Sequence, residues 1–360
     1  MPENTKEQVL SVRDLDITFK TTAGPVHAIR GVNIDLYKGE TVALVGESGS
    51  GKSVTMKAAM GILAQNAKVN SGSIQFSYHH ADGSPETVDL LQKDKKWIRR
   101  HINGKRIAMV FQDPMTSLDP TMTIGKQIME GMLWHYKMPK DAAYKKAVQL
   151  LEEVGITDAE KRMKSYPHQL SGGMRQRVVI AIALACDPDL LICDEPTTAL
   201  DVTIQAKILE LIRSIQRERG ISVIYITHDL GVVAKVADYV DVMYAGKIVE
   251  TGTIDEIFYD PRHPYTWGLI RSIPEQAIEE KKPLTPIHGN PPSLMNLPEG
   301  CVFSPRCPYA TDKCRKQRPE RVVTESGHYS ACHYSGDPEF LKNAPETSRT
   351  RKDSKKGGEA

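Results

Sequence analysis

One stretch of the chain carries residues whose types and spacing suit phosphate chemistry: residues 46–53 read Gly-Glu-Ser-Gly-Ser-Gly-Lys-Ser. Its glycines permit positive φ, so that successive backbone N–H groups can turn inward around an anion. Lys52 can reach the outer phosphates of a nucleotide, and the Ser53 hydroxyl can hold Mg²⁺. The stretch therefore predicts a loop that binds a nucleoside triphosphate. The residues predicted to bind it are Gly46, Ser48, Gly49, Gly51, Lys52 and Ser53.

An acidic pair, Asp194 and Glu195, follows the apolar run at residues 190–193. A short apolar run of this kind is typical of a buried strand. The Asp194 carboxylate can support Mg²⁺, and Glu195 is placed to polarise a water molecule for attack on the γ-phosphate. Alone, such a pair is typical of an ordinary loop. In a chain that also carries a phosphate-binding stretch, it indicates nucleotide hydrolysis.

These motifs require a sheet whose loops meet at one edge. Strand-like apolar runs occupy residues 9–19, 27–36, 41–45, 190–193, 223–226 and 239–243. An amphipathic helical pattern over residues 204–219 lies between two of them. Strands that alternate with helices predict an α/β fold with a parallel sheet covered by helices. The helical period that dominates from about residue 92 to 186 predicts a helical subdomain inserted into that fold.

The chain has 360 residues, which is long for one domain. We expect a main domain over residues 1–260 and a C-terminal extension over residues 261–334. Prolines are frequent between residues 274 and 300, which predicts a linker before a small cysteine-containing lobe. The polar tail at residues 335–360 is expected to be disordered.

Charge and composition argue against nucleic-acid binding and against a membrane-spanning segment. The formal net charge is +2 and aromatic residues make up 6% of the chain, so neither a basic surface nor a base-stacking platform is indicated. The longest apolar run, residues 178–186, is far shorter than the roughly 20 residues that span a bilayer. The N-terminus has no signal-peptide pattern. We expect a protein of the cytosolic side that reaches membranes through partners.

A further motif, Leu-Ser-Gly-Gly-Met-Arg-Gln at residues 170–176, resembles the signature motif of ATP-binding cassette (ABC) ATPases. Gln112, Asp201 and His228 occupy positions that match the same family in the same order. The resemblance covers residues 8 to about 260. It implies a P-loop NTPase cassette with a RecA-like core, an antiparallel β subdomain and an inserted helical subdomain.

The resemblance also implies roles for residues of the predicted site. Glu195 would be the catalytic base, and His228 would hold the γ-phosphate and the geometry of the attacking water. Gln112 would sense the metal and the water and would couple the site to a membrane partner. The implied catalytic residues are Glu195, His228 and Gln112, and those implied for Mg²⁺ are Ser53, Gln112 and Asp194.

Four more residues belong to the ATP site by resemblance. Ser171 and Gly173 of the signature motif would contact ATP held by an opposite cassette, because members of the family pack head to tail around two ATP molecules. Asp201 is counted with the residues that bind ATP. Phe19 lies where the family often has an aromatic residue that stacks on adenine, although a phenylalanine in a strand is as often part of a core.

The C-terminal part resembles one branch of this family. Residues 261–266 read Pro-Arg-His-Pro-Tyr-Thr, and a lobe with four cysteines follows. Both features resemble the extension of the ATPases of dipeptide and oligopeptide importers. The resemblance implies an ATPase at the cytoplasmic face of the plasma membrane, in a head-to-tail heterodimer with a second, homologous ATPase. Two membrane permeases and an extracellular solute-binding protein would complete the importer, without nucleic acid.

Two other functions stay open. Nickel importers are close relatives, and a nickel or haem importer would carry a similar ATPase because other subunits select the cargo. A soluble ABC ATPase that acts on DNA or ribosomes is the second alternative. The interval between the phosphate-binding stretch and the signature motif holds no sustained heptads, and the chain carries one cassette, which disfavours that alternative.

The four cysteines are Cys301, Cys307, Cys314 and Cys332, in a lobe too small for a substantial core. Structural disulfides are rare in the cytosol, so these thiols suggest a metal that stabilises the lobe. Some peptide-importer ATPases that resemble this chain carry a four-iron–four-sulfur (4Fe–4S) cluster on such a quartet, and we expect one here. Zn²⁺ is the alternative, although the spacing lacks the paired C-x-x-C of common zinc modules, and free thiols are the third. His328 and His333, near Cys332, could be ligands of such a metal or neighbours of its ligands, but we interpret both as surface histidines.

Residues 113–125, directly after Gln112, are expected to form the surface that contacts a membrane subunit. On this interpretation, an aspartate in place of Leu118 or Met122 would uncouple transport and leave ATP binding intact.

Overall fold

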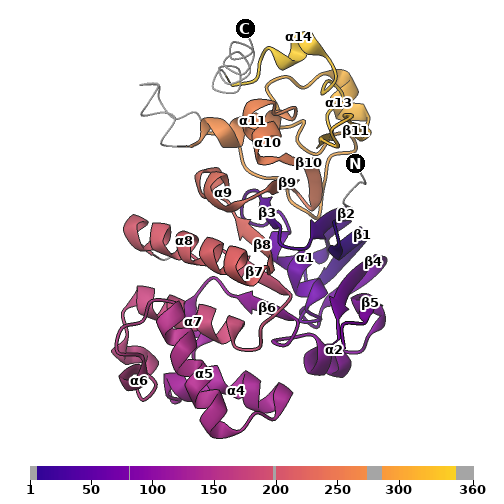
Figure 1. The fold of residues 1–360 in the computed structure, drawn as a ribbon. Helices are drawn as coiled ribbons and strands as arrows, with labels where there is room; N and C mark the ends of the chain where they lie inside the picture. The colour runs from indigo at the N-terminus through magenta and orange to yellow at the C-terminus, as the bar shows by residue number, and fades with distance from the viewer. Residues whose placement is uncertain (1–5, 81, 198–199, 274–285, 346–360) are drawn as a thin grey trace, which may run out of the picture.

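The computed structural model describes residues 6–80, 82–197, 200–273 and 286–345. Its strands form two sheets, one of four strands in the order β2-β1-β4-β5 and one of eight in the order β11-β12-β10-β9-β3-β8-β7-β6. The larger sheet runs through the middle of the molecule, with the helical subdomain at one end and the C-terminal extension at the other (Figure 1). Within the described ranges, no helix combines the length and the apolar character needed to cross a bilayer.

Strands and helices alternate through most of the chain. The strands are β1 (Gln8–Thr21), β2 (Gly24–Tyr37), β3 (Thr41–Val45), β4 (Ala67–His79), β5 (Pro85–Asp89), β6 (Ile107–Val110), β7 (Leu190–Asp194), β8 (Ser222–Thr227), β9 (Tyr239–Tyr244), β10 (Lys247–Thr253), β11 (Val322–Val323) and β12 (Tyr329–Ser330). The helices are α1 (Lys52–Ala59), α2 (Lys95–His101), α3 (Pro114–Ser117), α4 (Ile124–Tyr136), α5 (Lys140–Glu153), α6 (Ala159–Arg162), α7 (Gly172–Leu184), α8 (Val202–Arg219), α9 (Leu230–Val236), α10 (Ile254–Tyr259), α11 (Pro264–Arg271), α13 (Asp312–Lys316) and α14 (Pro338–Leu341).

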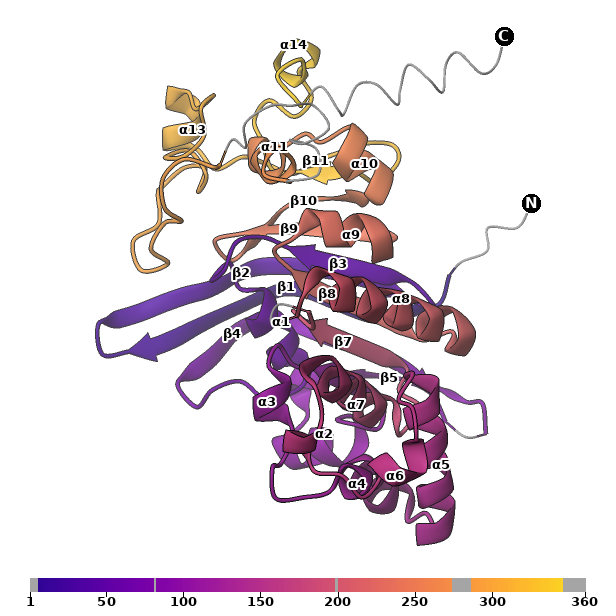
Figure 2. The same cartoon turned by 90° about the vertical axis from the view of Figure 1, so that its left-hand side faces the viewer.

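The four-stranded sheet is the antiparallel subdomain (Figure 2). β1 pairs antiparallel with β2 and β4, and β4 pairs with β5. Leu10, Val12 and Ile17 of β1 are fully buried in a core that also contains residues of α1 and of the larger sheet. The subdomain is therefore packed against the elements on both sides of the phosphate-binding loop.

The larger sheet confirms the predicted α/β fold. β9, β3, β8, β7 and β6 run parallel to one another, and β10 adds to β9 as an antiparallel strand. Every residue of β3, β7 and β8 is buried, which is typical of a parallel sheet covered on both faces. Because these strands are parallel, their carboxyl ends lie at one edge of the sheet, where α/β folds bind ligands.

The helical subdomain begins later than predicted. α2 is followed by β6, which pairs with β7 in the larger sheet, so the inserted helices start after Val110 and not near residue 92. β6 has only four residues, and a run that short carries no periodicity that could separate it from the helices around it. Beyond it, α4, α5 and α7 share a core that includes Ile128, Leu150 and Ile180.

The segment between α3 and α4 corrects one expectation about the membrane-facing surface. Leu118 is 4% exposed and belongs to the core of the helical subdomain, so an aspartate there would destabilise the fold instead of uncoupling a partner. The Gln127 side chain holds the segment from inside, since its Nε2 donates to the carbonyls of Asp119 and Met122 at 2.9 and 3.0 Å. Met122 stays partly exposed.

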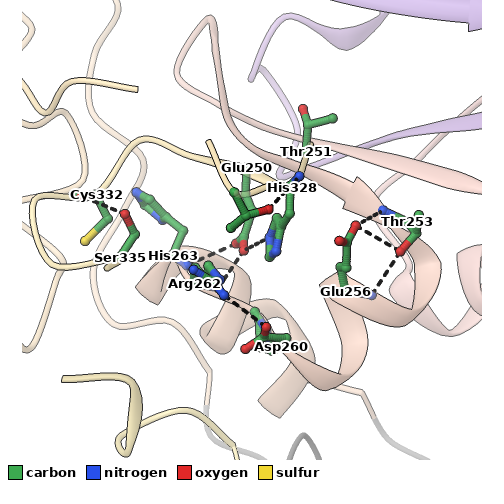
Figure 3. A network of polar contacts seen from close by, with 12 residues as sticks. Glu250, Thr251, Thr253, Glu256, Asp260, Arg262, His263, His328, Cys332 and Ser335 are labelled. Carbon is green, nitrogen blue, oxygen red and sulfur yellow. Dashed lines mark hydrogen bonds and ion pairs between the residues drawn. The ribbon is translucent and has the colours of Figure 1, made fainter. Parts of the chain in front are cut away.

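A buried polar network joins the extension to the last long strand of the cassette (Figure 3). The Glu250 carboxylate on β10 accepts the backbone N–H groups of Arg262 and His263 at 2.5 and 3.1 Å and lies 2.9 Å from His328 Nε2. The side chains of Glu250 and His328 are 0% and 1% exposed. The interpretation of His328 as a surface histidine is therefore wrong, because it is the buried partner of a carboxylate distant in sequence.

The His-Pro-Tyr motif begins helix α11. His263 Nδ1 accepts the N–H of Tyr265 at 3.1 Å, which caps the helix, and Pro264 occupies the first turn, where an N–H would have no helical partner. Burial lowers the pKa of His263 to about 3, so the ring is neutral and its nitrogen can accept. The motif thus fixes where α11 starts and which way Tyr265 projects.

The first part of the C-terminal tail is ordered. Phe340 on α14 packs with the rings of Trp267, Tyr309 and Tyr334, at centroid distances of 5.2, 5.5 and 5.3 Å. The expectation of disorder is wrong for residues 335–345, because this aromatic cluster holds them. Residues 346–360, on which the rest of that expectation falls, lie outside the described residues.

Candidate nucleotide-binding site

Four motifs that are distant in sequence meet at one edge of the larger sheet. The phosphate-binding loop follows β3, Gln112 follows β6, Asp194 ends β7 and His228 follows β8. A cavity of about 980 Å³ lies at that edge. Of the predicted site residues, it is lined by Ser48, Gly49, Gly51, Lys52, Ser53, Gln112, Glu195 and His228.

Two glycines of the loop have a backbone geometry that other residues rarely adopt. Gly46 and Gly51 have φ values of +154° and +108°. A Cβ on Gly46 would lie 2.0 Å from the carbonyl oxygen of Met243, and one on Gly51 would lie 2.6 Å from Cδ1 of Ile29. Glycine therefore lets the loop close against β9 and β2, and α1 begins directly after it with its N-terminus at the cavity.

Lys52 is held by the loop that it belongs to. Its Nζ donates to the carbonyl oxygens of Gly46 and Glu47 at 2.6 and 3.0 Å, and the residue is 5% exposed. Burial lowers the pKa of Lys52, while the nearby carboxylates of Glu195 and Asp194 oppose that shift. The ammonium group is thus already at the cavity, where phosphate oxygens can replace the two carbonyls.

Ser53 and Asp194 meet although 141 residues separate them. Ser53 Oγ donates to Asp194 Oδ1 at 2.7 Å. Mg²⁺ prefers oxygen ligands, so this pair fits the ion, which when bound supplies positive charge to the phosphate oxygens. Burial raises the pKa of Asp194, and its hydrogen bond from Ser53 opposes the shift. A divalent cation at this position would favour the ionised carboxylate.

Glu195 is positioned by the two other predicted catalytic residues. Gln112 Nε2 donates to Glu195 Oε2 at 3.1 Å, and His228 Nδ1 lies 3.2 Å from Oε1. Glu195 has a φ of +47°, which is uncommon for any residue but glycine, and its N–H donates to the Ile226 carbonyl at 2.9 Å. Such backbone strain concentrates at functional sites. The arrangement suits a proton acceptor oriented by two neighbours.

The C-terminal extension forms part of the cavity wall, which the sequence did not predict. Leu269, Ile287, Pro291 and Leu294 are among the residues that line the cavity. Three of these lie in the stretch whose proline content predicts a linker, and no pattern there indicates a binding role. Phe19 does not line the cavity but packs against the core of the antiparallel subdomain, so its stacking on adenine stays a prediction.

The signature motif and Asp201 lie apart from this cavity. Ser171 caps α7, where its Oγ accepts the Met174 N–H at 3.3 Å, and Asp201 caps α8 by accepting the Ile204 N–H at 2.9 Å. A Cβ on Gly173 would lie 2.9 Å from Cγ2 of Ile204, so glycine allows α7 to approach α8 closely. These three described residues do not line the cavity. Their local roles are structural, and a nucleotide that they contact must be held elsewhere.

The four cysteines of the lobe face one small space. Cys301, Cys307, Cys314 and Cys332 all line a cavity of about 20 Å³, and all are free thiols. Burial raises the pKa of Cys307 to about 11 and that of Cys332 to about 12. Among the described residues, no group of three Cys, His, Asp or Glu is arranged to hold a metal ion. The donor types suit a thiolate-bound metal, but the space is that of one water molecule and does not fit a 4Fe–4S cluster as the lobe stands.

Sequence reasoning also missed two residues of the extension that bond to the phosphate-binding loop. Arg306 and Tyr265 both contact Glu47. Tyr265 belongs to the His-Pro-Tyr motif, which the sequence shows as a resemblance to one family branch without indicating a contact. No local pattern around Arg306 points to a residue so far away in the sequence.

Two family models match the chain. One, described as ABC transporter, matches residues 29–198, and one described as oligopeptide/dipeptide transporter, C-terminal region, matches residues 249–314. The chain is 53% identical to the dipeptide transport ATP-binding protein DppD of Bacillus subtilis (strain 168), over 91% of this chain and 94% of that protein. It is 55% identical to the oligopeptide transport ATP-binding protein OppD of the same organism, over 89% of this chain and 87% of that protein.

A solved structure is similar as well. It is the dimeric structure of a post-hydrolysis state of the ATP-binding cassette MJ0796 bound to ADP and Pi. The TM-score is 0.58 at 25% identity, and the match covers 68% of this chain and 98% of that chain. The match covers nearly the whole of that cassette, so the matching part of this chain has the size of one cassette.

Proposed function

The chain belongs to the ABC transporter family, and within it to the ATP-binding subunits of dipeptide and oligopeptide transporters; we propose that it hydrolyses ATP to drive the import of short peptides. One observation carries the proposal: a site in which Gln112 and His228 flank the carboxylate of Glu195 occurs together with the extension matched at residues 249–314. The relatives are named for peptide transport, which favours peptides over nickel or haem as the cargo.

The geometry supports a division of labour among the residues of the cavity. Lys52 and the N–H groups of the loop bind the phosphates, and Ser53 with Asp194 holds Mg²⁺. Glu195 takes a proton from the attacking water, while Gln112 and His228 keep its two oxygens in place. Binding of ATP and release of ADP then favour different states of the transporter.

The assembly is a finer part of the same proposal. The signature residues Ser171 and Gly173 lie outside the cavity of their own chain, which supports a head-to-tail pair in which they contact ATP on the partner. The cassette with a similar fold is dimeric. We propose a homologous second ATPase, two permeases and an extracellular solute-binding protein as partners, with this chain at the cytoplasmic face of the membrane.

Peptide uptake tests this function directly. Uptake of labelled dipeptides and oligopeptides is measured in cells that carry the native chain or Glu195→Gln, with expression of both chains checked. Loss of uptake in the variant supports an ATP-driven peptide importer. Unchanged uptake in the variant moves the cargo to nickel, haem or another solute.

The surface after Gln112 provides a prediction about coupling. Met122 is partly exposed on a segment held by Gln127, so Met122→Asp should leave the fold and ATP binding intact while it lowers peptide uptake by about tenfold, because a charge is buried against the permease. Uptake in cells and ATP binding by the purified chain are measured together. The matched comparison is Leu118→Asp, which should lower the thermal midpoint because Leu118 is buried. Weak ATP binding by a folded Met122→Asp chain would contradict the assignment.

A metal centre in the cysteine lobe is also part of the proposal. Four thiols that line one cavity, two of them buried, support a thiolate-bound centre. Zn²⁺ needs less room than a 4Fe–4S cluster, but either centre requires the thiols to rearrange, because no three ligands among the described residues are arranged to hold a metal ion. In either case the centre would stabilise the lobe and would take no part in hydrolysis.

Metal analysis distinguishes these cases. The full chain, purified without oxygen, is expected to contain iron and acid-labile sulfide, or zinc, and Cys314→Ser should lose the metal and lower the thermal midpoint by a few degrees. Cys186→Ser, at a buried cysteine of the helical subdomain, is the matched control and should keep the metal. A native chain without iron or zinc would leave the four residues as free thiols.

A further inference from the structure

Arg306 of the cysteine lobe reaches into the phosphate-binding loop. Its guanidinium donates through both terminal nitrogens to the Glu47 carboxylate, at 2.6 and 2.9 Å. Its Nε donates to the His288 carbonyl at 2.9 Å, and only 5% of the side chain is exposed. A two-pronged contact between a buried arginine and a carboxylate fixes both distance and orientation.

Tyr265 holds the same loop residue by its backbone. The N–H of Glu47 donates to Tyr265 Oη at 2.8 Å. Tyr265 is fully buried and packs against Tyr244 and Phe303, with ring centroids 4.6 and 5.4 Å away. Since His263 caps the helix that carries Tyr265, the hydroxyl is held at a fixed position.

Glu47 also connects these contacts to the lysine of the site. Its carbonyl accepts Lys52 Nζ at 3.0 Å, and Glu47 itself lines the cavity, while Arg306 and Tyr265 do not. The extension thus bonds to the backbone N–H and the side chain of one loop residue whose carbonyl contacts the phosphate-binding lysine. A lobe more than 250 residues further along the chain is therefore bonded directly to the loop.

We propose that Arg306 and Tyr265 are positioning residues: through Glu47, the C-terminal extension sets the conformation of the phosphate-binding loop and hence its affinity for ATP. The inference rests on the proposed ATPase function. Without Arg306, the Glu47 carboxylate loses its cation beside the phosphates, which it then repels. Without the Tyr265 hydroxyl, the Glu47 N–H loses its acceptor and the loop is less constrained.

The expected signature separates affinity from turnover. Arg306→Gln should weaken the binding of a fluorescent ATP analogue with Mg²⁺ to the purified full chain by about tenfold or more. This is the effect expected from the loss of a charge-assisted hydrogen bond. The KM for ATP should rise in parallel, and kcat should change little, because none of the contacts described for Glu195, Gln112 and His228 involves Arg306 or Glu47. Tyr265→Phe should raise the same dissociation constant by a smaller factor.

The double variant tests whether Arg306 acts through Glu47. If it does, Glu47→Gln combined with Arg306→Gln should bind ATP better than Arg306→Gln alone, because the repelling carboxylate is gone. Arg315→Ala is the control, since Arg315 pairs only with Asp312 on the surface of the same lobe among the bonds described for it. Each variant is first compared with the native chain by thermal unfolding.

The outcomes are distinct. A native chain that hydrolyses ATP, with Arg306→Gln and Tyr265→Phe folded and at native affinity, overturns this inference and leaves the proposed function intact. A native chain that supports neither ATP hydrolysis nor peptide uptake in cells that also carry its proposed partners overturns the proposed function. If Arg306→Gln does not fold, Tyr265→Phe decides the question, because it removes one oxygen atom and keeps the packed ring.

Discussion

Replacing Glu195 with glutamine is expected to lower the rate of ATP hydrolysis by about 10²–10⁴-fold, because that is the usual contribution of a general base. ATP should still bind to the variant. A glutamine has the size of the glutamate and can keep an oxygen toward Gln112 Nε2, which donates at 3.1 Å in the native site. It cannot accept a proton from water. The hydrogen bonds of Lys52 to the loop carbonyls and of Ser53 to Asp194 do not involve this side chain, so binding should persist.

Two measurements check this result. Phosphate release is followed at saturating ATP with Mg²⁺, and binding is followed with a fluorescent ATP analogue. Glu210→Gln is the matched control, because Glu210 is an exposed glutamate on α8 that does not line the cavity. A Glu195→Gln chain with a near-native rate of phosphate release would remove Glu195 as the base.

Replacing Lys52 with alanine should weaken ATP binding by about a hundredfold, since charge-assisted hydrogen bonds are the strongest in such a site and each 1.4 kcal/mol is a factor of ten. Lys52 is 5% exposed and its Nζ lies against the loop carbonyls of Gly46 and Glu47. Alanine leaves those two carbonyls without their donor and the phosphates without their nearest cation. Both effects lower affinity.

The Lys52 variant is measured by titration with the same analogue, and its thermal midpoint is recorded to separate misfolding from lost binding. Lys207→Ala, at an exposed lysine of α8, is the control for loss of one positive charge. If a folded Lys52→Ala chain bound ATP as tightly as the native chain, the phosphates would not be bound by this loop.

Glu195→Gln and Lys52→Ala are expected to fail at different steps, so measuring both variants together shows which step a loss of uptake reflects. Glu195→Gln should bind ATP and stop before hydrolysis, whereas Lys52→Ala should fail to bind. In peptide uptake both should score as inactive. The difference between them in ATP binding would then locate the defect in the chemistry or in the affinity of the same cavity.

Much of the candidate site could be predicted from local sequence. The conformation of the phosphate-binding loop is set by its own residues, because Gly46 and Gly51 adopt the backbone angles that turn N–H groups inward. The carboxylates of Asp194 and Glu195 follow their strand directly. A parallel sheet then brings the ends of β3, β7 and β8 to one edge, so that the alternation of strands and helices places His228 near the loop. Gln112 follows β6, which the sequence pattern did not separate from the helical subdomain.

Only the tertiary structure decided which side chains are buried and which distant segments touch. Leu118 lies in a core, His328 is the partner of Glu250, and Arg306 holds Glu47, and each of these facts depends on how separate elements pack. Local propensity carries no information about them, because a contact across hundreds of residues is set by the sheet order and by the shape of the packed surfaces. The sequence by itself therefore determined the chemistry at the phosphates, whereas the connection between that chemistry and the C-terminal extension was decided by the fold.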